Sequence, residues 1–186
     1  AVMAAGLNPT VVDLNSFAVL RAIATTPGLG LNSRPEAVVD VGADLTNIIV
    51  HENGIPRFVR ILLSGGRQVT QALVEDQAMS LIDAEQVKRE IGLGEESGPM
   101  AGSVRTMSRA AGELIEEIRG SLDYYSATSS NGAVTRVVLS GGGARLMGFP
   151  ERLAERLRVP VEVGSTLSGL SVGRTGLSPA QMDYVD

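Results

Sequence analysis

Short apolar runs of the length of β-strands alternate along this chain with longer stretches whose apolar residues recur at helical spacing. The clearest run is residues 37–50, AVVDVGADLTNIIV, in which valines and isoleucines flank a turn at Gly42. β-branched residues favour strands and glycine permits a tight turn, so this stretch predicts a strand, a turn and a second strand. Further strands are predicted at residues 10–14, 55–63, 134–139 and 159–163. In residues 55–63, two arginines among apolar residues indicate an edge strand.

Helical spacing is clearest in residues 103–125, where apolar side chains recur every three or four positions and predict one buried stripe. That stripe consists of Val104, Met107, Ala111, Leu114, Ile115, Ile118, Leu122 and Tyr125. Shorter helices are predicted at residues 17–24, 67–79 and 84–91, the last with Asp83 as its N-cap, and another near Pro150. This order of elements predicts an α/β layer with a helical insertion, in which ligands bind at the carboxyl ends of the strands.

Composition narrows the classes of function. The chain has 186 residues, a net charge of −5 and no basic run, so nucleic acid is not an expected partner. It has no cysteine, which excludes disulfides, thiolate metal sites and a cysteine nucleophile. The single histidine, His51, closes a strand and is expected to be solvated there. No apolar run reaches membrane-spanning length, so no membrane insertion is expected.

Candidate chemistry lies in two glycine-bearing turns that follow strands. Asp40, Gly42 and Thr46 bring a carboxylate, a backbone amide and a hydroxyl to the first turn, a combination that suits Mg²⁺ and phosphate. Taken alone, this pattern is more typical of a β-hairpin whose glycine only makes the turn. The second turn lets backbone approach a ligand, or simply joins a strand to a helix. It consists of Gly141, Gly142 and Gly143.

Three separated segments together resemble the actin-like ATPase superfamily. VVDVGADLTNIIV resembles its second phosphate loop, AEQVKREIG at residues 84–92 its nucleotide-contacting helix, and VVLSGGGARLMGF at residues 137–149 its adenosine loop. Within that superfamily the chain is most similar to the PilM family of type IV pilus assembly proteins. The stretches that carry this similarity are AAGLNPTVVDLNSFAVLRA, LLSGGRQVTQAL, EIRGSLDYYS and LSGGGARLMGFPERLAERLRVPVEV.

The resemblance implies an ATP and Mg²⁺ site. Asp40 would orient Mg²⁺ through a water molecule, and Gly42 and Thr46 would cradle the β- and γ-phosphates. Gly141, Gly142 and Gly143 would approach the adenosine and the α-phosphate. Glu85 and Lys88, three residues apart on one helical face, would reach the ribose and the base, although such a pair is also typical of a surface salt bridge.

Two departures from the superfamily pattern predict slow or absent hydrolysis. Asn15 stands where related proteins often carry an acidic residue near the metal. Asp44 lies inside the phosphate turn, and two like charges about 4 Å apart repel by roughly 4 kcal/mol at an effective dielectric constant near 20. We therefore expect nucleotide binding at best, with lobe closure rather than rapid turnover as its effect.

The resemblance also implies an actin-like, ribonuclease H-like lobe with a small helical inserted subdomain. Residues 1–26 would end a first lobe, residues 27–64 and 103–186 would form the core of the second lobe, and residues 65–102 would be the insertion. The implied protein is a cytoplasmic scaffold at the inner face of the cytoplasmic membrane. Its implied partners are the tail of a PilN-like protein, bound mainly by the first lobe, and the pilus assembly ATPases. Residues 177–185 are a candidate segment for self-association, with a disordered tail as the favoured alternative.

Other functions remain open from the sequence. An FtsA-like or MreB-like filament protein would share the segment AEQVKREIG. A nucleotide-free actin-like secretion-platform domain, like that of GspL, would account for Asn15 and Asp44. An enzyme such as a sugar kinase is the weakest alternative, because no substrate acid or base stands out beyond Asp40.

Overall fold

The computed structural model describes residues 2–23, 34–165, 173, 176–178 and 181, and its centre is one mixed sheet of five strands. The strand order is β3-β2-β1-β4-β5, with β1 antiparallel to β2, β2 antiparallel to β3, and β4 parallel to both β1 and β5. The bounds are β1 Glu36–Val41, β2 Thr46–Glu52, β3 Ile55–Leu62, β4 Val137–Ser140 and β5 Val161–Val163. Because β1 and β4 are parallel neighbours, their carboxyl ends meet at one edge, where Asp40 pairs with Ser140.

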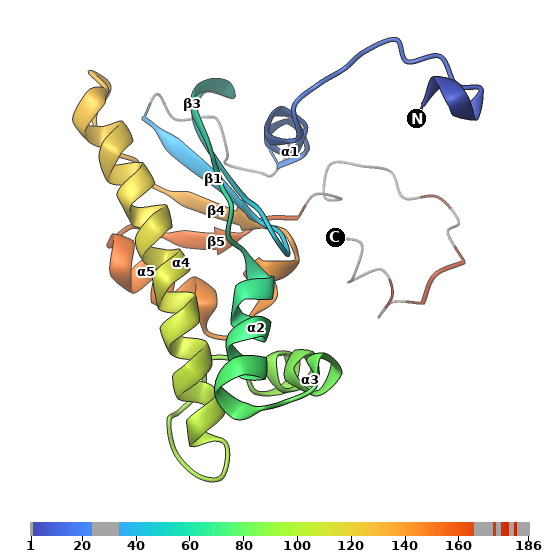
Figure 1. Ribbon diagram of the computed structural model, residues 1–186. Helices are drawn as coiled ribbons and strands as arrows, with labels where there is room; N and C mark the ends of the chain where they lie inside the picture. The colour runs from blue at the N-terminus through green and yellow to red at the C-terminus, as the bar shows by residue number, and fades with distance from the viewer. Residues whose placement is uncertain (1, 24–33, 166–172, 174–175, 179–180, 182–186) are drawn as a thin grey trace.

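Helices lie on both faces of this sheet and beyond one end of it (Figure 1). Figure 1 shows α1 on one face, α4 and α5 on the other, and α2 with α3 past the end of the sheet. The α-helices are α1 Asn15–Ile23, α2 Gly66–Gln77, α3 Leu81–Ile91, α4 Ala101–Thr128 and α5 Phe149–Leu157, and the 3-10 helices are η1 Met3–Ala5 and η2 Gly142–Arg145. The helical insertion therefore consists of α2 and α3, which enter the chain between β3 and α4.

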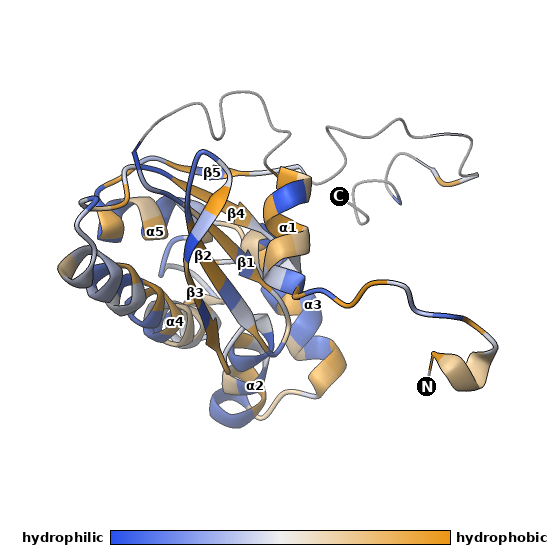
Figure 2. Cartoon of the chain, turned by 90° about the horizontal axis from the view of Figure 1, so that it is seen from above, coloured by the Kyte–Doolittle hydropathy of each residue, from blue (hydrophilic) through white to orange (hydrophobic). Residues whose placement is uncertain are grey.

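Strand alternation divides the apolar residues between two cores. Val39 and Val41 of β1 face the larger core under α4 and α5, whereas Val38 faces a smaller core with Leu20 and Ile23 of α1. Figure 2 shows the sheet coloured largely as hydrophobic, in keeping with burial of its central strands on both faces. Within the described part of the chain, no helix is long and apolar enough to cross a membrane.

Most elements confirm the pattern from which they were predicted. All eight apolar residues of the stripe in residues 103–125 are buried on α4, and β3 is an edge strand. The prediction of a strand at residues 10–14 is wrong: these residues form no strand, and Val11 and Val12 are 80% and 92% exposed. A strand needs a neighbour to pair with, and within residues 2–23 and 34–165 none lies beside this segment.

Two local predictions are also corrected. α3 begins one residue after Ser80, whose hydroxyl accepts a hydrogen bond from the Asp83 amide at 3.2 Å, so Ser80 rather than Asp83 is the N-cap. His51 is not solvated but fully buried, opposite Glu36 in the β1–β2 register. The lobe boundary predicted after Thr26, and most of residues 177–185, lie outside the described residues.

Candidate functional site

The turn between β1 and β2 is closed by its own backbone and fixed to the start of α2. The amide of Gly42 donates to the carbonyl of Leu45 at 2.9 Å. The carbonyls of Gly42 and Ala43 accept from the amides of Gly66 and Arg67 at 2.9 and 2.8 Å. The first two amides of α2 thus hold the turn in place.

Glycine is required where α2 meets this turn. A Cβ on Gly65 would lie 2.6 Å from the carbonyl oxygen of Gly42 and 2.7 Å from that of Ala43. Backbone oxygens this close leave no room for a side chain, so Gly65 lets the helix begin directly on the turn. The sequence signal, two glycines after an apolar strand, marks this contact.

The glycine loop after β4 packs just as closely on the end of β1. A Cβ on Gly141 would lie 2.5 Å from the Val41 carbonyl oxygen and 2.8 Å from Asp40 Oδ1, and one on Gly143 would lie 2.4 Å from Val41 Cγ1. Gly142, between them, faces open space. The loop therefore lies against the strand that carries Asp40.

Asp40 is oriented from the opposite side by a polar chain that begins on α1. Asn47 on β2 donates from Nδ2 to Asp40 Oδ2 at 3.3 Å. Asn47 Oδ1 accepts a hydrogen bond from the hydroxyl of Ser16, also at 3.3 Å. Asn15, the first residue of α1, directly precedes Ser16. The position expected to carry an acidic residue in related proteins therefore lies next to this series of hydrogen bonds.

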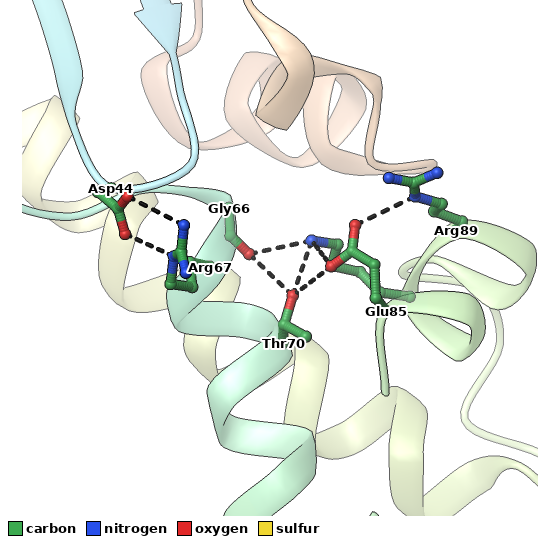
Figure 3. Close-up of polar contacts among 7 residues, drawn as sticks. Asp44, Gly66, Arg67, Thr70, Glu85 and Arg89 are labelled. Atoms are coloured by element: carbon green, nitrogen blue, oxygen red, sulfur yellow. Dashed lines mark hydrogen bonds and ion pairs between the residues drawn. The ribbon is translucent and has the colours of Figure 1, made fainter. Parts of the chain in front are cut away.

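Lys88 joins α3 to the start of α2 through a compact group of polar contacts. Figure 3 labels the other members of this group, Gly66, Thr70, Glu85 and Arg89. The Lys88 ammonium group lies 2.7 Å from Glu85 Oε2 and donates to Thr70 Oγ1 at 2.8 Å and to the carbonyl of Gly66 at 3.2 Å. The Thr70 hydroxyl lies 2.7 Å from Glu85 Oε2, and Arg89 reaches the other Glu85 oxygen at 3.1 Å. Burial raises the pKa of Glu85, but the hydrogen bonds from Lys88 and Thr70 outweigh it and hold that pKa below its usual value.

These contacts bring the three segments of the sequence to one point beside Gly66. A Cβ on Gly66 would lie 3.5 Å from Gly143 Cα, 3.6 Å from the carbonyl oxygen of Gly42 and 4.0 Å from Lys88 Nζ. Residues as far apart in the sequence as Gly42, Lys88 and Gly143 therefore converge at the carboxyl edge of β1 and β4. This is where ligands bind in α/β sheets.

The donors of the first turn are not all available to a ligand. The Gly42 amide already donates to Leu45, and the Thr46 hydroxyl is buried and donates to the carbonyl of Ser64 at 2.8 Å. In the described part of the chain, the amides of Ala43 and Asp44 donate to no backbone carbonyl. A phosphate on this turn would therefore meet the amides of Ala43 and Asp44, with Gly42 and Thr46 shaping the turn behind them.

Asp44 does not stand alone in the turn as a bare negative charge. Its Oδ1 lies 2.6 Å from Arg67 Nε, and its Oδ2 accepts from an Arg67 terminal nitrogen at 3.2 Å (Figure 3). The sequence alone does not reveal this ion pair, because Arg67 lies 23 positions away from Asp44 along the chain. Arg67, Thr70, Asn47 and Ser16 are the polar residues that sequence reasoning missed at this edge.

A metal here would depend on ligands from outside the chain. Among the described residues, no three acidic or histidine side chains gather closely enough to hold a metal ion. Mg²⁺ is commonly held by one or two carboxylates together with phosphates and water, and this edge offers the carboxylate of Asp40 besides that of Asp44, which is paired with Arg67. The residues present fit that mode, in which the nucleotide itself supplies the other ligands.

Two features define an actin-like α/β fold. One is the mixed sheet with helices on both faces, and the other is the convergence of the β1–β2 turn, α3 and the glycine loop at one edge. Solved structures share it: MreB5 of Spiroplasma citri bound to AMPPNP has a TM-score of 0.65 at 11% identity, over 87% of this chain and 56% of that one. The archaeal actin homolog Ta0583 in complex with ADP has a TM-score of 0.61 at 17% identity, over 82% and 51%. At these identities the likeness concerns the fold alone.

The chain belongs to the family of the type IV pilus assembly protein PilM, which it matches over residues 1–183. In the PilM-PilN type IV pilus biogenesis complex, a solved chain is 26% identical with a TM-score of 0.79, over 98% of this chain and 51% of that one. This chain thus spans about half the length of the relatives it matches. The family shown is thus that of PilM, and not an FtsA-like or MreB-like one.

Proposed function

We propose that this chain is the nucleotide-binding half of an actin-like scaffold in a type IV pilus assembly platform. The single observation that carries the proposal is the convergence of the β1–β2 turn, the start of α2, Lys88 and the glycine loop beside Gly66. Family membership supports the pilus context, and nucleotide-bound relatives of the same fold support the ligand.

In this proposal each loop binds a different part of the nucleotide. The amides of Ala43 and Asp44 bind phosphate oxygens, and Asp40, held by Asn47, orients Mg²⁺ through water. The glycine loop after β4 lies against the adenosine and the α-phosphate because its residues carry no side chains. Glu85 and Lys88 reach the ribose and base from α3, although their contacts with Thr70 also serve to tie α3 to α2.

Hydrolysis is slow or absent in this account. Of the acidic groups at this edge, Asp44 is paired with Arg67 and Glu85 with Lys88, and Asp40 Oδ2 already accepts a hydrogen bond from Asn47. A general base must lie within hydrogen-bond reach of the attacking water, and Asn15 offers no negative charge for that role. Nucleotide would then act by closing the site against the rest of the protein, which is a shift of population rather than turnover.

The proposed partners follow from the family. The relative in the PilM-PilN complex supports a PilN-like inner-membrane protein as partner, with its tail bound mainly outside this chain. The scaffold would lie in the cytoplasm against the inner face of the membrane and would also contact the pilus assembly ATPases. Binding of a fluorescent PilN tail peptide to the intact protein, measured by anisotropy with and without Mg-ATP, tests whether nucleotide controls this contact.

A nucleotide-free, GspL-like scaffold is the second candidate function. It is favoured by the engaged Gly42 amide and Thr46 hydroxyl, and by the carboxylate of Asp44 on the turn. In that case the fold serves protein contacts alone, and the polar contacts of Lys88 are structural.

Isothermal titration calorimetry of Mg-ATP with the intact protein, as the cell makes it, separates the two candidates. The proposal predicts binding that weakens by roughly tenfold or more, about 1.4 kcal/mol, in Asp40→Asn. Asp123→Asn on α4 makes the same charge change far from the site and should leave the affinity unchanged. If the wild-type protein binds no nucleotide, the nucleotide-free scaffold is correct.

A further inference from the structure

Asp44 and Arg67 form a two-pronged ion pair on the turn where a phosphate would bind. Arg67 Nε lies 2.6 Å from Asp44 Oδ1, and a terminal nitrogen donates to Oδ2 at 3.2 Å (Figure 3). Both side chains are largely exposed, Arg67 at 60% and Asp44 at 63%. The pair therefore lies on the surface of the site and can open without disturbing a core.

The backbone fixes Arg67 over this turn independently of its side chain. Its amide donates to the carbonyl of Ala43 at 2.8 Å, and the neighbouring Gly66 amide donates to Gly42. The backbone of Arg67, from which the guanidinium group extends, is thus fixed to the turn that carries the amides of Ala43 and Asp44. The guanidinium group reaches the Asp44 carboxylate from there, so a ligand seated on those amides lies within its range.

Carboxylate and phosphate compete for a guanidinium group with the same geometry. Each presents two oxygens that match the fork of nitrogens on arginine. Asp44 is placed to accept that fork, and its charge also repels any anion on its own backbone amide. A phosphate can bind at the turn favourably when the guanidinium group of Arg67 leaves the Asp44 carboxylate and binds the phosphate. It can also do so when Arg67 lies between the two negative charges and screens their repulsion.

We propose that Arg67 is a phosphate-binding residue of this site and that Asp44 is its internal competitor. The proposal rests on the nucleotide site proposed above. Without nucleotide, Arg67 pairs with Asp44, as in the structure; with nucleotide, the guanidinium exchanges that carboxylate for a phosphate. Asp44 thereby lowers the affinity of the site and makes it depend on the charge of the phosphate chain.

A double-mutant cycle in the intact protein tests this exchange. Mg-ATP binding is measured by calorimetry in the wild type, Asp44→Asn, Arg67→Gln and the double variant, with Asp123→Asn as the control for net charge. Asp44→Asn should tighten binding by about fivefold, the size of an exposed charge pair. Arg67→Gln should weaken binding by about fivefold in the wild type and again in the Asp44→Asn background.

The loss of affinity on Arg67→Gln in the Asp44→Asn background shows whether Arg67 binds the phosphate or only neutralises Asp44. If Arg67 only neutralises Asp44, Arg67→Gln has no effect once Asp44 is replaced, and the proposal is overturned. Equal affinity in all four proteins also overturns it while leaving the nucleotide site intact. Failure of all four to bind refutes the nucleotide site itself, and binding by Asp44→Asn alone supports a strong block by Asp44. Superimposable circular dichroism melting curves show that the variants are folded.

Discussion

The close approach of the glycine loop to β1 predicts that replacing Gly141 lowers stability strongly, whereas replacing its neighbour Gly142 does not. Gly141 has φ +84° and ψ 163°, a conformation open almost only to glycine. An alanine Cβ there would also lie 2.5 Å from the carbonyl oxygen of Val41 and 2.8 Å from Asp40 Oδ1. Both effects act on the strand end that carries the candidate site.

The cost of Gly141→Ala can be estimated from these two effects. A residue held in this backbone region costs about 1–3 kcal/mol. Forcing an added methyl group against fixed neighbours costs about 1–3 kcal/mol more. Relaxation of β1 and the loop will recover part of this, so we expect a loss of about 2–5 kcal/mol in the free energy of unfolding.

Gly142→Ala supplies the matched control, because a Cβ at Gly142 meets nothing within 4 Å and its φ is not positive. Urea unfolding followed by far-ultraviolet circular dichroism measures both variants. Gly142→Ala should stay within about 1 kcal/mol of the wild type. If Gly141→Ala proves as stable as Gly142→Ala, the loop does not pack on β1 as described and the reasoning fails.

Three further predictions concern the rest of the fold. Ile118→Ala in the buried stripe of α4 should lower the free energy of unfolding by about 2–5 kcal/mol, whereas Ile82→Ala, at an 80% exposed position, should change it by less than about 0.5 kcal/mol, both measured in urea. Ser80→Ala removes the N-cap of α3 and should cost about 0.5–2 kcal/mol in the same assay; no loss would show that the cap is not formed. Burial lowers the pKa of His51, and the charge of Glu36 offsets only part of this. The folded state then resists protonation, so stability should fall as the pH drops below about 6.5, and His51→Gln should flatten that part of the profile.

Sequence patterns predicted those elements whose burial is periodic. The stripe on α4 follows from spacing alone, since a helix that packs on a sheet must bury one face. The start of α3 was misplaced because Leu81 and Ile82 are apolar yet exposed, so no pattern marks the first turn. The burial of His51 depends on its partner across the strand pair, Glu36, and strand pairing is not visible in a single sequence.

The candidate site divides in the same way. Glycines at strand ends marked the turn and the loop, because close backbone approach leaves a direct trace in residue type. Arg67, Thr70 and Asn47 leave no such trace. Their roles come from contacts with residues 7 to 31 positions away along the chain, which depend on how α1, α2, α3 and β2 are placed in space.

A crystal structure of the intact protein with Mg-AMPPNP would show whether three segments of this chain form one nucleotide site. We expect phosphate oxygens on the amides of Ala43 and Asp44, the nucleoside against the loop of Gly141 to Gly143, and Lys88 in contact with the same ligand. A nucleotide bound elsewhere, or none at saturating concentration, would contradict this expectation and leave an actin-like fold that serves protein contacts alone.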